Sequence, residues 1–218
     1  MQNTILKCEN LHKSFRKKEI LKDVSLEICS GDILGFIGPN GAGKTTTIKL
    51  ILGLQKIGSG KVIINGFDIQ KNFEKAIAKV GAIIENPDLY MYMSGYDNLK
   101  LISNLYPNVD EARINEVIKL VGLENRINDK VSKYSLGMRQ RLGVAQAILH
   151  KPNLLILDEP TSGLDGKNMQ KVADILNDMA SKGAAVIVIT HDLELINKVC
   201  RFALRLPVEN KNIIKKAV

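Results

Sequence analysis

The chain has 218 residues, 45% hydrophobic and 25% charged, and a soluble sequence of this size and balance can bury the core of one or two domains. No apolar run approaches the roughly 18 to 20 residues that span a bilayer, and the N-terminus lacks the pattern of a secretory signal. The net charge of +8 comes from scattered basic residues without zinc spacing or an RNA-recognition motif, which favours a solvated surface over a nucleic-acid site.

The opening third of the chain predicts short β-strands separated by glycine-containing turns. Ile33–Ile37 is apolar throughout, as expected of a strand that is buried on both faces. Lys44–Leu54, which follows a glycine-rich loop, has the pattern of a helix. The predicted strands of this part are residues 4–9, 24–28, 33–37 and 61–64.

The glycine-rich loop GPNGAGKT, residues 38–45, matches the phosphate-binding pattern GxxxxGK[ST] at every required position. Its glycines let backbone N–H groups approach phosphate oxygens without a Cβ in the way. We expect Lys44 to reach the β- and γ-phosphates and the Thr45 hydroxyl to bind Mg²⁺. A chance glycine turn is the alternative, but the strand before the loop and the helix after it favour ATP binding. The loop residues predicted to hold the nucleotide are Gly38, Pro39, Asn40, Gly41, Ala42, Gly43, Lys44, Thr45 and Thr46.

The middle of the chain changes to helical spacing and predicts an inserted helical lobe. Asp110 is a plausible cap for the second of its helices. Further on, a buried strand, a helix and another buried strand return, which together indicate a parallel sheet with helices around it. The predicted elements are helices at 97–106, 109–121 and 135–149, a strand at 154–157, a helix at 169–180 and a strand at 185–189.

Two acids, Asp158 and Glu159, directly follow the apolar strand Leu154–Leu157. A carboxylate at the sheet edge beside the phosphates can hold Mg²⁺ through its water shell, and we assign this role to Asp158. Glu159 can polarise the water that attacks the γ-phosphate. A solvated strand end is the alternative, and the phosphate loop on the same chain is what favours the catalytic interpretation.

With these motifs in order, the chain resembles the ATP-binding subunit of an ATP-binding-cassette (ABC) transporter over residues 6–200. The resemblance implies an α/β P-loop NTPase with a mainly parallel core sheet, an N-terminal antiparallel β subdomain and an inserted helical subdomain. It also implies a single ATP-binding domain over residues 1–218. Its parts would be a core lobe at 1–86 and 151–206, a helical subdomain at 87–150 and a short C-terminal tail at 207–218.

SLGM, residues 135–138, stands where the family has its LSGGQ signature. The resemblance implies a head-to-tail dimer with ATP, in which Ser135 and the backbone around Gly137 touch the γ-phosphate held by the other copy. SGLD, residues 162–165, resembles the loop that communicates across that dimer.

His191 and Phe15 also match family positions. The resemblance implies that His191 is a switch histidine, which contacts the γ-phosphate and supports the catalytic Glu159, while Lys44 completes the catalytic set. It further implies that Phe15 stacks on adenine. From the residues alone, a packed or solvated histidine and a core phenylalanine remain open alternatives.

The sequence departs from the family pattern at three places. Glu85 replaces the usual Gln and is expected to touch both the nucleotide and Mg²⁺, where its charge changes metal affinity or turnover. The signature has Leu136 for the first Gly and Met138 for Gln, so one side-chain amide is missing from the ATP interface. Residues 201–206 differ from the usual ending of the family.

The motifs IIENP (83–87) and YSLGMRQRLG (134–143) resemble the branch that handles bacitracin and lantibiotics in resistance and self-immunity. This implies an ATPase that powers export of such a peptide through separate membrane permease subunits. The permease is expected to dock near Glu85–Ser94, where tyrosines and methionines are adaptable anchors. Packing of these side chains on their own lobe is the alternative.

The three cysteines are widely spaced and favour reduced thiols in a cytosolic protein. The resemblance implies that this cytoplasmic protein is peripheral on the inner face of the membrane. A different function class is a soluble ABC-type ATPase that acts on nucleic acid or a protein assembly. Such proteins often fuse two cassettes or carry long coiled coils, and this chain has neither. A small-molecule kinase would not explain SLGMRQR or His191. We therefore predict ATP, Mg²⁺, a second copy and a permease as partners, without nucleic acid.

Overall fold

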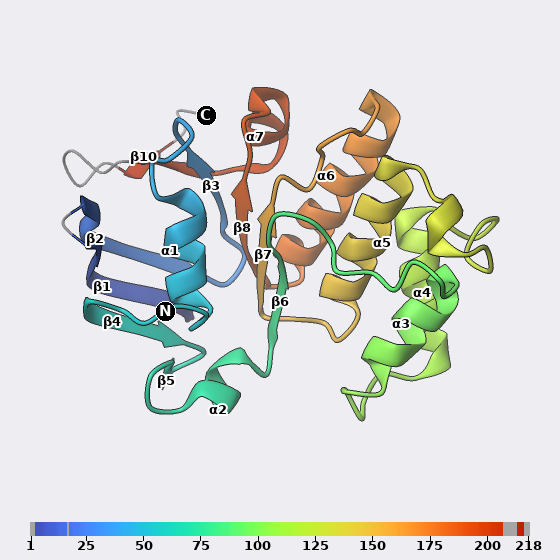
Figure 1. Cartoon of the computed structure of the whole chain (residues 1–218), viewed down its shortest axis with the longest axis horizontal. Coiled ribbons are helices and arrows are strands. Elements are labelled where there is room, and N and C mark those ends of the chain that lie inside the picture. The colour runs from blue at the N-terminus through green and yellow to red at the C-terminus, as the bar shows by residue number, and fades with distance from the viewer. Residues whose placement is uncertain (1–2, 17, 207–212, 216–218) are drawn as a thin grey trace.

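The computed structural model describes residues 3–16, 18–206 and 213–215, and two β-sheets lie beside a group of helices in it (Figure 1). The first sheet is antiparallel, in the order β2-β1-β4-β5. Its strands are β1 (Thr4–Phe15), β2 (Lys18–Cys29), β4 (Ser59–Ile64) and β5 (Phe67–Asp68).

The second sheet has the order β10-β9-β3-β8-β7-β6, and all its neighbouring strands are parallel except the pair β9 and β10. The expected mainly parallel core sheet and the N-terminal antiparallel sheet are thus confirmed. The strands are β3 (Ile33–Ile37), β6 (Val80–Ile83), β7 (Leu154–Asp158), β8 (Ala185–Ile189), β9 (Phe202–Arg205) and β10 (Ile213–Lys215).

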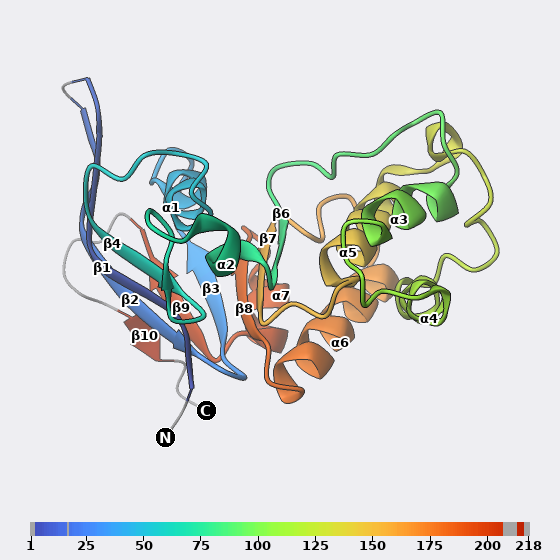
Figure 2. The ribbon, with the colours of Figure 1, turned by 90° about the horizontal axis from the view of Figure 1, so that it is seen from below.

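The helices divide between the two lobes, with α3, α4 and α5 on the side away from the antiparallel sheet (Figure 2). Asp110 caps α4 as expected, since its Oδ1 accepts a hydrogen bond of 2.8 Å from the Arg113 backbone N–H. The helices are α1 (Lys44–Ile51), α2 (Phe73–Ile77), α3 (Gly95–Ser103), α4 (Glu111–Val121), α5 (Leu136–Ile148), α6 (Gly166–Ser181) and α7 (Leu193–Val199), with a 3₁₀ turn at Val131–Lys133.

Alternation along the central strands builds two hydrophobic clusters, one on each face of the parallel sheet. On β7, Leu154 and Ile156 join the cluster that contains α1 and the antiparallel sheet, while Leu155 and Leu157 join the cluster beneath the helical lobe. All four side chains have no exposed surface. Burial on both faces explains why these strands consist of apolar residues, each of which stabilises the fold by about 1.5–3 kcal/mol.

The helical lobe sits close against the edge strand β6 because a glycine permits it. A Cβ on Gly81 would lie 2.0 Å from the Ala147 carbonyl oxygen of α5, a distance that no side chain tolerates. α5 therefore lies directly against β6. The signature segment, at the N-terminus of α5, is connected to the parallel sheet through this contact.

The first helix ends earlier than the sequence pattern indicated. α1 ends at Ile51 rather than Leu54, because Gly53 takes a left-handed φ of 68° and the Leu54 N–H turns back to the Lys49 carbonyl at 2.8 Å. Within residues 201–206, which the sequence analysis singles out, Phe202–Arg205 forms β9 in parallel register with β3. The expected tail at 207–218 lies outside the described residues apart from β10.

Candidate active site

A cavity of about 480 Å³ opens where three parallel strands end. β3 leads into the glycine-rich loop, β7 ends at Asp158 and β8 ends one residue before Thr190, so loops from distant parts of the sequence meet at one sheet edge. Most of the predicted site residues line this cavity. The lining residues are Phe15, Ile20, Asn40, Gly41, Gly43, Lys44, Thr45, Thr46, Glu85, Asp158, Glu159 and His191.

The glycine-rich loop has the backbone shape that a phosphate cradle requires. Gly41 and Gly43 adopt left-handed φ angles of 81° and 92°, and a Cβ on Gly41 would point into open space. Gly43 stands at the N-cap of α1 without a side-chain cap, and the first turn of α1 carries no acidic residue. The partial positive charge of this helix end is therefore free for an anion, which fits phosphate groups.

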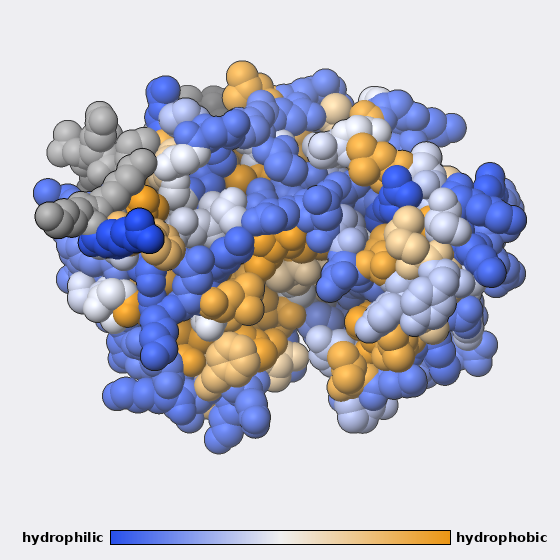
Figure 3. Space-filling view, viewed as in Figure 1, coloured by the Kyte–Doolittle hydropathy of each residue, from blue (hydrophilic) through white to orange (hydrophobic). Residues whose placement is uncertain are grey.

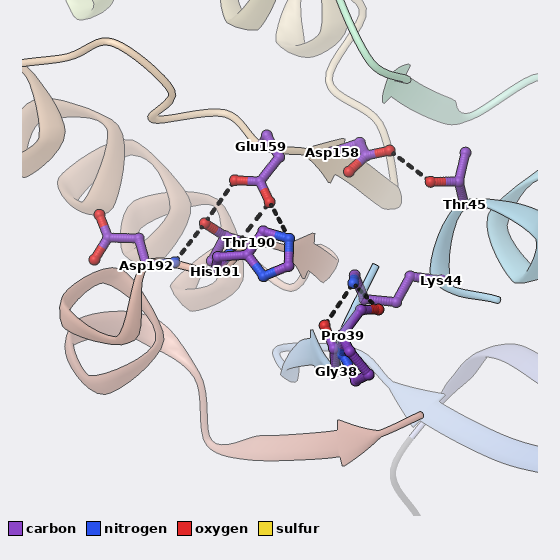
Figure 4. A network of polar contacts seen from close by, with 9 residues as sticks. All are labelled: Gly38, Pro39, Lys44, Thr45, Asp158, Glu159, Thr190, His191 and Asp192. Carbon is purple, nitrogen blue, oxygen red and sulfur yellow. Dashed lines mark hydrogen bonds and ion pairs between the residues drawn. The ribbon is translucent and has the colours of Figure 1, made fainter. Parts of the chain in front are cut away.

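Lys44 is a buried cation with only neutral partners. Its side chain is 7% exposed, and its Nζ donates to the carbonyl oxygens of Gly38 at 2.6 Å and Pro39 at 3.0 Å (Figure 4). Among the described residues, no carboxylate forms an ion pair with it. A buried charge is stable when it is paired, so this ammonium group is suited to an anionic ligand such as a phosphate.

Asp158 and Thr45 supply hard oxygen donors for a metal ion. Thr45 Oγ1 donates to Asp158 Oδ2 at 3.3 Å, and the Asp158 side chain is 5% exposed. Burial raises the pKa of Asp158, and the nearby Glu159 carboxylate raises it further. A cation beside these oxygens would offset that unfavourable burial, and Mg²⁺ commonly combines one or two protein carboxylates with phosphate oxygens and water. The residues present therefore fit this metal.

Glu159 is held in a defined orientation by the end of β8. Its Oε2 accepts a hydrogen bond of 3.0 Å from Thr190 Oγ1, and its Oε1 accepts one of 3.2 Å from the His191 backbone N–H. The imidazole Nε2 of His191 lies 3.6 Å from Oε1, and Figure 4 shows both residues directed at the same carboxylate. The positive φ of 50° at Glu159 is sterically unfavourable, and these contacts offset it.

Thr190 is the residue of this network that the sequence reading missed. It is 1% exposed, and its Oγ1 also accepts a hydrogen bond of 3.0 Å from the Asp192 backbone N–H. The signal in the sequence was a threonine placed between the apolar strand at 185–189 and the candidate catalytic residue His191.

Glu85 lies at the cavity wall but does not direct its carboxylate at Asp158. Its Oε1 is 3.0 Å from Lys49 Nζ. The role of Glu85 as a metal ligand thus stays a prediction. At the mouth of the cavity, Phe15 is 46% exposed with Lys13 Nζ 5.0 Å from its ring centre. The alternative of a core phenylalanine is wrong, and adenine stacking stays a prediction.

The signature residues lie apart from the cavity. Ser135 is the N-cap of α5, where its Oγ accepts a hydrogen bond of 3.3 Å from the Met138 backbone N–H. A Cβ on Gly137 would lie 2.9 Å from Leu164 Cδ2, so the signature contacts the 162–165 loop. Neither Ser135 nor Gly137 lines the cavity, and a single chain therefore does not bring the two motifs together. Ala42, the remaining loop residue, is buried.

Comparisons with known proteins agree with this arrangement. Residues 21–162 match the ABC transporter family. YdbJ and YhcH of Bacillus subtilis, both uncharacterised ABC transporter ATP-binding proteins, are 49% and 48% identical over 92% and 90% of this chain. The chain spans about 65% of the length of these two relatives. The lantibiotic transport ATP-binding protein SrtF of Streptococcus pyogenes is 38% identical over 97% of this chain and 90% of its own length.

Solved structures share the fold over both lobes. The structure of an ATP-binding subunit of an ABC transporter has 29% identity and a TM-score of 0.88, and the match covers 97% of this chain and 90% of that one. A dimeric ATP-binding cassette in a post-hydrolysis state, bound to ADP and Pi, is 24% identical with a TM-score of 0.87 over 98% of this chain and 100% of that one. The second similarity concerns the fold alone.

Proposed function

The chain belongs to the ABC transporter family, and on that premise we propose that it binds and hydrolyses ATP to power export through a separate membrane permease. The observation that carries the proposal is the meeting of Lys44, Asp158 and Glu159 in one cavity. Each performs a different part of phosphoryl transfer.

The chain's own residues account for the steps of hydrolysis. The N–H groups of the glycine-rich loop and Lys44 bind and orient the phosphates of ATP. Mg²⁺, held by Asp158 and Thr45, would neutralise charge on the phosphates when it is bound. Glu159 orients the attacking water and accepts its proton, and the hydrogen bonds from Thr190 and the His191 backbone keep its carboxylate in place.

A second copy of the chain is the partner that completes the nucleotide site in this proposal. Ser135 and Gly137 lie outside the cavity of their own chain, and the N-terminus of α5 has no acidic residue in its first turn. Backbone N–H groups at such a helix end favour a phosphate. We infer a head-to-tail dimer in which this end of α5 contacts the γ-phosphate held by the other copy.

The membrane permease has a groove of about 500 Å³ to dock in, between α2, β6 and α5. Apolar side chains gather where the two lobes meet (Figure 3), and the groove is continuous with the segment that begins at Glu85. In that segment Tyr90, Met91 and Tyr92 are 47%, 40% and 71% exposed, so part of each side chain is accessible to a partner. Among the described residues, no helix has the length and apolar character of a membrane span.

A peptide antibiotic or lantibiotic is the substrate class we propose. SrtF is named for lantibiotic transport, and the 37% identical BcrA of Bacillus licheniformis is named for bacitracin transport. The names of the more similar YdbJ and YhcH indicate no substrate. With the permease as its anchor, the chain would work as a cytoplasmic subunit peripheral to the inner face of the membrane.

The experiment measures phosphate release by the purified chain and by Lys44→Ala. We expect the substitution to abolish ATP binding and turnover, by at least about 100-fold, because a buried charge that contacts phosphate is lost. Co-expression with a polytopic membrane protein encoded by an adjacent reading frame should then confer bacitracin or lantibiotic resistance. The Lys44→Ala substitution should remove that resistance. ATP consumption that is unchanged in Lys44→Ala would overturn the ATPase. Salt-dependent nucleic-acid binding without any effect of the permease would favour the other function class.

A further inference from the structure

Glu85 brings a third carboxylate to a cavity that must accept a polyanion. Asp158 and Glu159 line the same cavity, and Lys44 is its one lysine among the described lining residues. A further negative charge within a few ångströms of bound phosphates weakens their binding by about 1 kcal/mol or more in a partly buried site. The position of Glu85 therefore requires an explanation that the proposed ATPase mechanism does not supply.

Lys49 forms an ion pair with Glu85, and Lys49 itself does not line the cavity. It lies in the last turn of α1, five residues after the phosphate-binding Lys44, and its Nζ is 3.0 Å from Glu85 Oε1. The side chains are 32% and 63% exposed, and a pair as open as this adds little to folding stability. A contact of that kind is easily broken and formed again. Its contribution is therefore the position that it gives to the Glu85 carboxylate.

The backbone of Glu85 has an uncommon conformation at the cavity wall. Its φ is 63°, in the left-handed region, and the residue lines the cavity together with Asp158. Glu85 thus shares the cavity with the predicted metal ligand and pairs with Lys49 through its side chain. It also begins the Glu85–Ser94 segment that we assign to permease docking.

We propose that Lys49 is a positioning residue that holds the Glu85 carboxylate away from the phosphates and neutralises its charge. The proposal rests on the nucleotide site proposed above. In the absence of Lys49 the carboxylate is free to turn into the cavity, where it repels phosphate and attracts a divalent cation. Nucleotide binding without metal then weakens, while the dependence of binding on Mg²⁺ becomes steeper.

The test is a double-mutant cycle on ATP binding, measured by calorimetry in EDTA and again in Mg²⁺. The variants are Lys49→Gln, Glu85→Gln and the pair together. Lys49→Gln should weaken metal-free ATP binding about five- to tenfold and enlarge the ratio of the EDTA to the Mg²⁺ dissociation constant. Adding Glu85→Gln should reverse both effects, and Glu85→Gln should change the affinity at least about fivefold more without Lys49 than with it.

Two controls separate positioning from structure. Lys49→Arg keeps the charge and should bind ATP within about twofold of the wild type. Lys61→Gln removes the exposed lysine that lies 3.9 Å from Asp68, outside the cavity, and should leave the affinity and its metal dependence unchanged.

An equal effect of Glu85→Gln in both backgrounds, or equal effects of Lys49→Gln and Lys61→Gln, would overturn the positioning role while the ATPase stands. If the wild type does not bind ATP, or binds it no better than Lys44→Ala, the nucleotide site itself fails instead. Melting temperatures verify that every variant is folded.

Discussion

The phosphate pocket and the signature face differ in what completes them. The phosphate pocket, formed by Lys44, Thr45, Asp158, Glu159 and His191, is built by contacts within one chain, and the loop after β8 donates two hydrogen bonds to the Glu159 carboxylate. The signature face, formed by Ser135, Leu136 and Gly137, lies at the N-terminus of α5 against the 162–165 loop, and Leu136 is 48% exposed. The difference fits our proposal that a second copy of the chain completes the nucleotide site.

Glu159→Gln tests the pocket most strongly, because it removes the charge that accepts a proton and keeps the shape. We expect the rate of ATP hydrolysis to fall about 100- to 1,000-fold, while ATP binding stays within about threefold. Bound ATP that is not hydrolysed should hold two chains together, and light scattering after size exclusion would show this dimer. Only monomer in the presence of ATP would contradict the shared site, and unchanged hydrolysis would contradict the role of Glu159.

Ser135→Ala tests the signature face without touching the pocket. It removes an N-cap, which lowers stability by about 1 kcal/mol, and in our proposal it also removes a contact to the γ-phosphate of the other copy. Hydrolysis should fall about tenfold, whereas the affinity of the monomer for ATP should not change. Initial rates over a range of chain concentrations measure the first effect, and calorimetry measures the second.

Ser94→Ala is the matched control, since Ser94 caps α3 in the same lobe by accepting a hydrogen bond of 3.0 Å from the Asp97 backbone N–H. The two substitutions should destabilise the chain alike, and only Ser135→Ala should slow hydrolysis. An equal loss of hydrolysis in both would mean that the signature face acts through helix stability alone.

The same contrast explains what the sequence predicted well. The phosphate loop is local, so the spacing of its glycines, Lys44 and Thr45 specifies both its shape and its position before α1. The buried strands β7 and β8 were also predictable, because apolar runs between turns have few other structures. α7 follows the capping residue Asp192, whose side chain accepts from the N–H groups of Glu194 and Leu195, but seven residues give too weak a period to recognise.

Contacts between distant segments could not be predicted from the sequence. Thr190 meets Glu159 across 31 residues and Lys49 meets Glu85 across 36, and no periodicity encodes either pair. The short strand β9 depends likewise on its register with β3, since a strand of four residues has no strong pattern of its own. Motifs within one segment of the chain were thus predictable, whereas contacts between segments that only the tertiary fold brings together were not.

Asp158→Asn should produce the smallest effect, and its sign separates the two regions. Burial raises the pKa of Asp158 in the folded chain, so the ionised carboxylate opposes folding, and this penalty grows as the pH rises from the ordinary range of an aspartate toward the folded pKa. Without nucleotide at pH 7, Asp158→Asn should therefore raise the melting temperature by about 2–4 °C, which is roughly 1 kcal/mol for a chain of this length. Ser135→Ala should lower the melting temperature.

The increase in the melting temperature of Asp158→Asn should disappear in Mg²⁺ and ATP, because only the wild type then has a cation beside Asp158. Calorimetric scans with and without ligand measure both states. A lower melting temperature for Asp158→Asn without ligand would mean that the hydrogen bond from Thr45 outweighs the cost of burial, and that Asp158 does not destabilise the pocket before its ligand binds.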